Sequence, residues 1–354
     1  AAVAGVASVV APSVAKAQGP ITMRWQSTWP SKDIFHEYAL DFGKKVNDMT
    51  GGDLKIEVLP AGAVVPAFQL LDAVSKGVLD GGHGVLVYHY GKQTALALWG
   101  SGPGYGMDAN MLLSWHKYGG GKQLLEKIFA SIGANVVSFP YGPMPTQPLG
   151  WYKKPMTKVD DFKGLKFRTV GLATGIYQGL GASVVSVAGA EVASSLDRGV
   201  IDAAEFNNPT SDTVYGLPDV RKVLMARSYH QASETLEISL NKTKYESMPK
   251  DLQAIMKYAA FAESANGEWK QMDKNSKDFA ALAGKGVKVV KTPQSVLDAQ
   301  LRAWDTVIAA ESKDNPDFVA ILNSQKAWAQ RIFPWADTIN IPTPDPVSYR
   351  AMFK

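Results

Sequence analysis

The chain has 354 residues, of which 46% are hydrophobic and 20% are charged, and it contains no cysteine. This length and balance fit a soluble globular protein with a large buried core and two domains. The formal net charge of +4 comes without a basic run, which argues against a nucleic-acid-binding surface. The absence of cysteine excludes disulfides, thiol nucleophiles and cysteine zinc sites.

Residues 1–17 have the pattern of an export signal. They form an apolar run of small residues that ends in Ala15-Lys16-Ala17, an A-x-A cleavage pattern, and no Met or basic segment precedes them. We expect a signal peptide that has lost its start and is cleaved near Ala17-Gln18, and hence a periplasmic protein. The alternative is an Ala-rich tail, whereas Pro12 and Lys16 make a membrane span too short.

The first part of the mature chain alternates between strand and helix patterns. Apolar and polar residues alternate over 21–25, which predicts a strand, and apolar residues at helical spacing predict a helix that ends near residue 50. Further patterns predict a strand over 54–59 and a helix over 68–78. This alternation is typical of βαβ units in a parallel sheet.

An internal repeat indicates two similar halves. Residues 73–82 resemble residues 194–204: each segment is the end of an amphipathic helix, then Gly, two apolar residues, Asp and two small residues. Asp80 and Asp202 take corresponding places, and each precedes a short strand whose carboxyl end is where α/β sheets place ligands. We expect two similarly built lobes that face one cleft, unless two ordinary helix-to-strand turns match by chance.

The last third is helical. Apolar spacing predicts a long helix after Pro249 and further helices near 295–312 and 317–333, and the Pro-rich residues 341–346 predict an extended tail. We expect three segments in the mature chain. Residues 18–145 form the main part of lobe I, and residues 146–235 form the main part of lobe II. Residues 236–354 supply a crossover strand, a long connecting helix and C-terminal helices that pack on both lobes.

Catalytic motifs are missing from the sequence. The five histidines show no H-E-x-x-H spacing, and there is no G-x-S-x-G elbow or Walker loop. His83 with His89 as metal ligands, and Glu191 with Glu205 as an acid–base pair, have little support. We therefore predict no catalytic residue.

Three polar residues form a more coherent set, because each lies at the end of one of three successive predicted strands. Arg168 offers a planar fork that binds a carboxylate through two hydrogen bonds, although it could also form a surface salt bridge. Glu205 closes an apolar strand, where a carboxylate is usually paired or bound to a cation. Gln147 adds an amide oxygen, and sodium or calcium takes oxygen ligands of this kind. The aromatic residues that could wall such a pocket, or instead belong to the core, are Trp29, Tyr88, Tyr90, Trp151 and Phe206.

With these residues in place, the sequence resembles the substrate-binding proteins of tripartite ATP-independent periplasmic (TRAP) transporters. The resemblance runs from about Met23 to Phe353. The segments that carry it are Leu59-Pro60-Ala61-Gly62, 68–80, 161–168 and 199–205. Segments 147–152 and 203–206 look closest to the subgroup that binds 2-oxo and 2-hydroxy monocarboxylates.

The resemblance implies an α/β fold of two lobes with a central cleft, a long connecting helix and C-terminal helices. It implies that Arg168 binds the substrate carboxylate and that a sodium or calcium ion bridges ligand and protein. Gln147 and Glu205 match the side-chain ligands of that ion, and Phe206 matches a backbone carbonyl ligand, although relatives have Trp there. Asn207 and Gln231 match pocket positions where this chain differs from the subgroup.

The resulting hypothesis is a periplasmic receptor, not an enzyme, for a 2-oxo or 2-hydroxy acid such as pyruvate or lactate. It would deliver its ligand to TRAP membrane subunits, and a homodimer is compatible with its C-terminal helices. Three alternatives remain open at this stage. They are a receptor for a dicarboxylate or sugar acid without metal, a secreted metal-assisted hydrolase or lyase that uses Glu205, and a sensor module.

Overall fold

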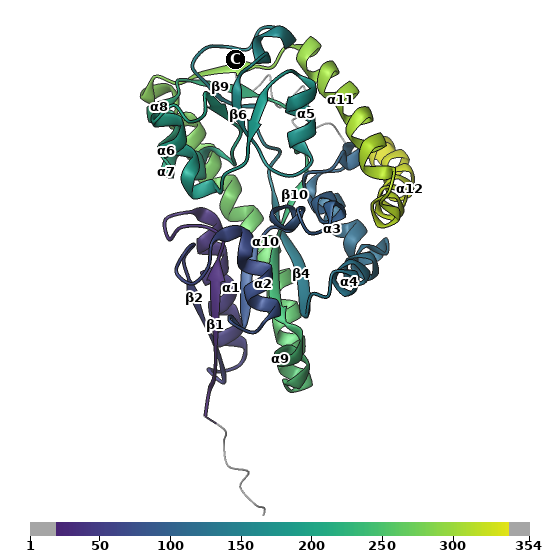
Figure 1. The fold of residues 1–354 in the computed structure, drawn as a ribbon. Helices are drawn as coiled ribbons and strands as arrows, with labels where there is room; N and C mark the ends of the chain where they lie inside the picture. Colours follow the sequence, from purple (N-terminus) through teal and green to yellow (C-terminus); the bar gives the residue numbers. More distant parts are fainter. Residues whose placement is uncertain (1–18, 340–354) are drawn as a thin grey trace, which may run out of the picture.

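A computed structural model describes residues 19–339, which form two α/β lobes around separate sheets (Figure 1). The predicted α/β class with two lobes and a long connecting helix is confirmed. The predicted signal segment 1–17 and the Pro-rich residues 341–346 lie outside the described residues.

Lobe I is built on a five-stranded sheet. Its strands, in spatial order, are β2 (Leu54–Leu59), β1 (Ile21–Ser27), β3 (Gly81–Gly84), β10 (Glu234–Asn241) and β4 (Val136–Met144). Strand β1 pairs in parallel with β2 and β3, whereas β10 is antiparallel to both β3 and β4.

Lobe II is built on a six-stranded sheet. Its strands, in spatial order, are β11 (Lys288–Lys291), β9 (Val223–Ala226), β5 (Gly150–Tyr152), β8 (Ala203–Ala204), β6 (Lys166–Arg168) and β7 (Ser183–Val185). Strand β6 pairs in parallel with β7 and β8, whereas β5 is antiparallel to both β8 and β9. Apart from β11, this repeats the order of the lobe I sheet.

The antiparallel strand of each sheet, β10 in lobe I and β5 in lobe II, directly follows a segment in which the chain crosses from one lobe to the other. The chain leaves lobe I after β4 and enters lobe II at β5, then returns from β9 to β10. The crossings at 145–149 and 227–233 lie next to the boundaries predicted after residues 145 and 235. The predicted division into main parts of lobe I at 18–145 and lobe II at 146–235 stays a prediction.

The internal repeat occupies equivalent places in the two sheets. The backbone N–H of Arg24 in β1 donates to Asp80 Oδ2 at 2.7 Å, and that of Lys166 in β6 donates to Asp202 Oδ2 at 3.0 Å. Each Asp backbone N–H in turn donates to the carbonyl of the same residue, Arg24 or Lys166. Each Asp therefore fixes the parallel strand that follows it to the neighbouring strand, at Arg24 within β1 and at Lys166 at the start of β6.

The helices cover both sheets. They are α1 (Ile34–Met49), α2 (Leu70–Ser75), α3 (Ala109–Tyr118), α4 (Gly121–Ser131), α5 (Ala173–Gly179), α6 (Val192–Asp197), α7 (Pro209–Val214), α8 (Leu217–Val220), α9 (Lys242–Ser247), α10 (Lys250–Ala281), α11 (Gln294–Ser312) and α12 (Pro316–Ile339). The 32-residue α10 packs on α1 and β4 in lobe I and on α7 in lobe II, so it spans the molecule (Figure 1).

The helix predicted over 68–78 is wrong in extent. Residues Ala67–Gln69 form a 3-10 turn, and α2 ends at Ser75. Gly77 has φ of +74°, a left-handed conformation that ends a helix and that a residue with a Cβ rarely adopts.

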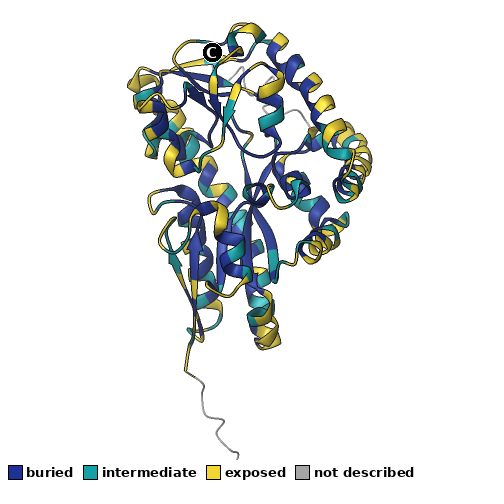
Figure 2. Cartoon of the chain, in the orientation of Figure 1, coloured by how far each residue is buried: buried dark blue, intermediate teal, exposed yellow. Residues whose placement is uncertain are grey.

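Buried residues gather in the strands of both lobes (Figure 2), and aromatic side chains pack in each core. In lobe I, Trp25 of β1 stacks on Phe42 of α1 with ring centroids 5.4 Å apart. In lobe II, Phe167 of β6 stacks on Tyr177 of α5 at 3.9 Å. Trp25 of β1 and Phe167 of β6 point into their cores. Successive side chains of a strand point to opposite faces, so the next residues, Gln26 and Arg168, point away from these aromatic clusters.

Candidate functional site

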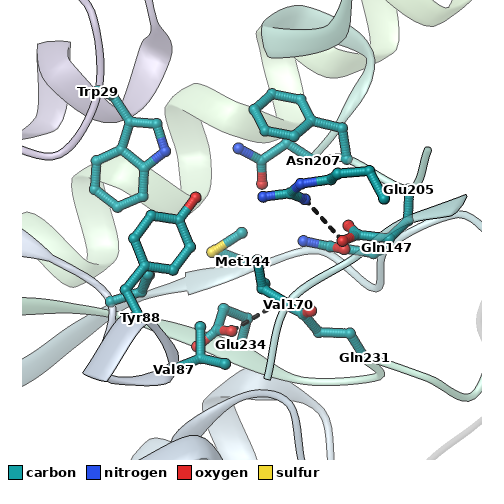
Figure 3. A pocket seen from close by; sticks show the side chains of 13 residues that line it. Trp29, Val87, Tyr88, Met144, Gln147, Val170, Glu205, Asn207, Gln231 and Glu234 are labelled. Atoms are coloured by element: carbon teal, nitrogen blue, oxygen red, sulfur yellow. Dashed lines mark hydrogen bonds and ion pairs between the residues drawn. The ribbon is translucent and has the colours of Figure 1, made fainter. Parts of the chain in front are cut away.

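A small cavity lies between the two lobes. Both lobes and both crossings contribute to it (Figure 3). Its lining residues are Trp29, Val85, Val87, Tyr88, Met144, Gln147, Arg168, Val170, Glu205, Phe206, Asn207, Gln231 and Glu234.

Arg168 ends β6 and carries the only guanidinium among these lining residues. Its side chain is 2% exposed, Nε donates to the carbonyl of Val187 at 3.0 Å, and Nη1 donates to Glu205 Oε1 at 2.8 Å. Within residues 19–339, Nη2 is buried without a hydrogen-bond partner. An unpaired buried donor on a permanent positive charge is a site for an anionic oxygen.

Glu205 follows β8 and is 1% exposed (Figure 3). Burial raises the pKa of its carboxyl, and the ion pair with Arg168 counters that rise. The pair lies between lobes rather than within a lobe core, because β6 and β8 are neighbours that end together at the cleft. A carboxylate in this position can share its second oxygen with a cation.

Gln147 lies in the first crossing, ahead of β5, and is 6% exposed. Its Oε1 is 3.4 Å from Nε2 of His230, a buried imidazole whose pKa is lowered by burial to about 3. A neutral imidazole has one donor and one acceptor nitrogen, so His230 can hold the Gln147 amide in a fixed orientation. The two crossings thus meet beside the arginine.

Lobe I supplies the apolar side of the cavity. Trp29 and Tyr88 point across it towards lobe II (Figure 3). On the other side, the Phe206 ring lies 5.7 Å from the Arg168 guanidinium carbon, and Asn207 Oδ1 is buried with no partner in the described part of the chain. The Arg168–Glu205 ion pair is therefore on lobe II, and the aromatic wall is largely on lobe I.

Sequence reasoning missed the carboxyl of Glu234, which is 1% exposed at the start of β10. Its Oε2 accepts from Gln231 Nε2 at 2.7 Å, and burial raises its pKa well above the usual range. A Cβ on Gly100 would lie 1.8 Å from Glu234 Oε1, so that glycine makes the space for the carboxyl. Glu234 reaches the cavity because it begins β10, the strand that follows the return crossing from lobe II. No local motif in the sequence signals that position. The apolar lining residues Val85, Val87, Met144 and Val170 were missed for the same reason.

Two residues predicted to wall the pocket lie elsewhere. Trp151 is fully buried in the lobe II core, where its indole N–H donates to Asp212 Oδ2 at 2.7 Å. Tyr90 lines a neighbouring hollow with Phe68 and His89. Trp29, Tyr88, Gln147, Arg168, Glu205, Phe206, Asn207 and Gln231 do come together around the cavity.

The cavity favours a hard cation over a transition metal. In the described ranges, no group of three or more His, Asp or Glu residues could hold a metal. The available donors are instead the Glu205 carboxylate, the Gln147 amide and the Phe206 backbone carbonyl, oxygen donors that suit sodium or calcium once a ligand adds its own oxygens. These residues fit such an ion.

Two α/β lobes that close over an arginine define the class of two-lobed solute-binding proteins. The model of bacterial extracellular solute-binding protein family 7 (DctP) matches residues 26–314, so the chain belongs to this family of TRAP solute receptors. Its members are periplasmic receptors in transport, not enzymes, that bind small organic acids and act with TRAP membrane components. Across residues 19–339, no helix is both long and apolar enough to cross a bilayer.

Three comparisons are informative. The chain is 33% identical to a monocarboxylate 2-oxoacid-binding periplasmic protein of Nostoc, over 88% of this chain and 86% of that protein. A TRAP receptor of Bordetella bronchiseptica, a dimer with calcium and picolinate, is 27% identical with a TM-score of 0.87, over 91% of this chain and 95% of that one. A receptor of Pseudoalteromonas atlantica with sodium and pyruvate is 28% identical with a TM-score of 0.82, over 90% and 97%.

Proposed function

We propose that this chain captures a 2-oxo or 2-hydroxy monocarboxylate, such as pyruvate or lactate, and holds it through a sodium or calcium ion. The observation that carries the proposal is the buried Arg168–Glu205 pair, with Arg168 Nη2 unpartnered among the described residues, beside the Gln147 amide. The ligand carboxylate accepts from Arg168, and its oxygens complete a shell that Glu205, Gln147 and the Phe206 carbonyl begin.

Charge balance supports the cation. Arg168 and Glu205 neutralise one another, so a bound carboxylate would leave an uncompensated negative charge in a closed cavity. A buried unpaired charge is costly, and a sodium or calcium ion removes that cost. The ions reported in the Bordetella and Pseudoalteromonas proteins, calcium and sodium, are of this type.

The chemistry of the lining supports a small monocarboxylate over a dicarboxylate or a sugar acid. Arg168 is the only basic residue in the lining of the cavity. Much of the remaining lining is apolar, namely Trp29, Val85, Val87, Met144 and Val170. A second carboxylate or a row of hydroxyls would lose its hydration without equivalent partners.

A thermal-shift screen of about fifty organic acids tests the proposal, repeated after chelation and in sodium-free buffer. Ligand at ~100 times its Kd adds about 2.7 kcal/mol, a shift of a few degrees. We expect pyruvate, lactate or a close 2-oxo acid to stabilise the protein only with the cation present. Stabilisation by larger acids without any cation would contradict the metal-bridged site, and turnover of an acid would favour the hydrolase or lyase alternative.

A homodimer remains a prediction. The long α10 exposes Tyr258, Trp269 and Met272, an apolar series that a second copy could cover. Light scattering at rising protein concentration tests it, and a constant monomer mass would contradict it.

A further inference from the structure

We propose that Asp33 forms a closing latch with Ser211 and Tyr215, which ties ligand capture on lobe II to lobe I without touching the ligand. The inference rests on the proposed function, because it concerns closure around the same cavity. It assigns a positioning role to three residues outside the cavity lining.

The first contact of the latch is a hydrogen bond between lobes. Asp33 precedes α1 of lobe I, where its Oδ1 accepts from the Phe35 backbone N–H at 2.7 Å and caps the helix. The same Oδ1 accepts from the Ser211 hydroxyl of α7 in lobe II at 3.2 Å. Both side chains are wholly buried, so lobe opening would expose them to water.

The second contact is incomplete in this structure. Asp33 Oδ2 and the Tyr215 hydroxyl are both buried and lack hydrogen-bond partners within the described chain. Burial and the Asp33 carboxylate both raise the pKa of the Tyr215 phenol, and the Tyr215 hydroxyl in turn opposes the rise that burial imposes on the pKa of Asp33. An acceptor on one lobe and a donor on the other, each unsatisfied, gain a hydrogen bond if closure tightens slightly.

Both lobe II partners lead directly to the ligand cavity. Ser211 belongs to the turn in which Asp212 Oδ1 accepts from the Asn207 backbone N–H at 3.0 Å, and Asn207 lines the cavity. Tyr215 packs edge-on against Phe206 with ring centroids 5.0 Å apart. A ligand that orders residues 206 and 207 therefore also positions the two hydroxyl groups that face Asp33.

The latch predicts an effect on affinity through closure alone. A receptor whose binding-competent closed form is less populated binds more weakly by that factor. Loss of one hydrogen bond to a charged group should therefore raise the Kd about tenfold. A purely structural contact would lower the melting temperatures of free and bound protein equally and leave the Kd unchanged.

The test uses Ser211→Ala, Tyr215→Phe and Asp33→Ser, the last of which keeps a good helix cap but shortens the side chain. Thr213→Ala is the matched control, since Thr213 lies on α7 and its hydroxyl has no partner in the described residues. The readouts are the Kd for pyruvate in sodium chloride and calcium chloride, and a distance between spin labels on Lys55→Cys and Lys154→Cys. The absence of native cysteine makes this labelling specific.

We expect each latch variant to raise the Kd about tenfold and to shift the label distance of free protein towards longer values, while Thr213→Ala changes neither. Unchanged Kd and distances in Ser211→Ala and Tyr215→Phe would overturn the latch, as would an equal effect of Thr213→Ala. If the unmodified protein binds no acid, the proposed function fails, and the label distances of the free variants still decide the latch.

Discussion

The cleft ends of the two sheets share a frame but carry different chemistry. The equivalent hydrogen bonds of Asp80 and Asp202 make Gln26 of lobe I the counterpart of Arg168 in lobe II, and His83 the counterpart of Glu205. Gln26 accepts from the backbone N–H groups of Val64 and Val65, so its amide serves its own lobe. Lobe I residues at these positions are satisfied internally, whereas Arg168 keeps a free donor within the described chain.

The shared topology determines where a ligand can bind. Single residues then decide which lobe holds the charged carboxylate of the ligand. His83 is buried between Ser27 and Tyr141, and burial lowers its pKa to about 3, so it stays neutral. Burial raises the pKa of its counterpart Glu205, and the ion pair with Arg168 opposes that rise. We infer that lobe II binds the acid first and that lobe I then covers it.

The largest effect should come from removing the arginine. Arg168→Ala should raise the Kd for the acid at least about 100-fold. It should also lower the free energy of unfolding by about 3–5 kcal/mol, because Glu205 is left buried and unpaired. Calorimetry and urea denaturation measure both.

The matched control is Gln26→Ala at the equivalent position of lobe I. It should cost stability through its lost backbone hydrogen bonds and leave the Kd unchanged. An Arg168→Ala protein with wild-type affinity would place the anion elsewhere.

A second, smaller effect should separate Glu205 from His83. Glu205→Gln keeps an acceptor for Arg168 but removes the negative charge that attracts a cation. We expect acid affinity to fall about 10- to 100-fold and its dependence on calcium or sodium to disappear. His83→Gln should retain the cation dependence, and metal analysis of both dialysed proteins checks the difference. Unchanged metal content in Glu205→Gln would rule out its role as a ligand of the ion.

A third test concerns the paired positions Gly81 and Ala203. A Cβ on Gly81 would lie 2.3 Å from the Trp25 ring, whereas the counterpart Ala203 already carries one beside Phe167. Gly81→Ala should destabilise by about 1–3 kcal/mol through overpacking. Ala203→Gly should cost only about 1 kcal/mol. Urea denaturation of the two variants measures the asymmetry, and equal losses would show that the sheets are packed alike.

The smallest effect is a pH dependence from lobe I. Glu237 in β10 is buried and accepts from the Ser138 hydroxyl, and burial raises its pKa from 4.5 to about 7. A raised carboxyl pKa means that the folded state binds more protons, so this contribution to stability is lost as the pH rises towards 7 and above. Between pH 6 and pH 8 the loss should be about 1 kcal/mol.

Glu237→Gln should remove that slope, which urea denaturation at the two pH values measures. A slope that persists in Glu237→Gln would assign the pH dependence to another group.

Local patterns predicted much of the frame and the charged part of the site. Strands β1 and β2, the long α10 and the repeated Asp turn follow from spacing that is visible in short segments. Arg168 and Glu205 were found because each closes a strand, whereas Gln147, predicted on the same ground, lies in the first crossing, between β4 and β5. Trp151 shows the limit, since its partner Asp212 is 61 residues away and only the fold makes its indole a core group. A crossover strand was expected from residue 236, but its place between β3 and β4 was not, because that pairing joins segments about 100 residues or more apart in the chain.

The two crossings also determine the order in which the protein can be assembled. Strand β10 lies between β3 and β4, so the lobe I sheet has a gap at its middle until the chain beyond residue 234 is available. Lobe II, in contrast, contains most of its strands in one continuous stretch. Long sequence separation between paired strands slows folding. We therefore expect lobe II to fold first and lobe I to wait, which gives an exported chain time to cross a membrane before its structure is complete.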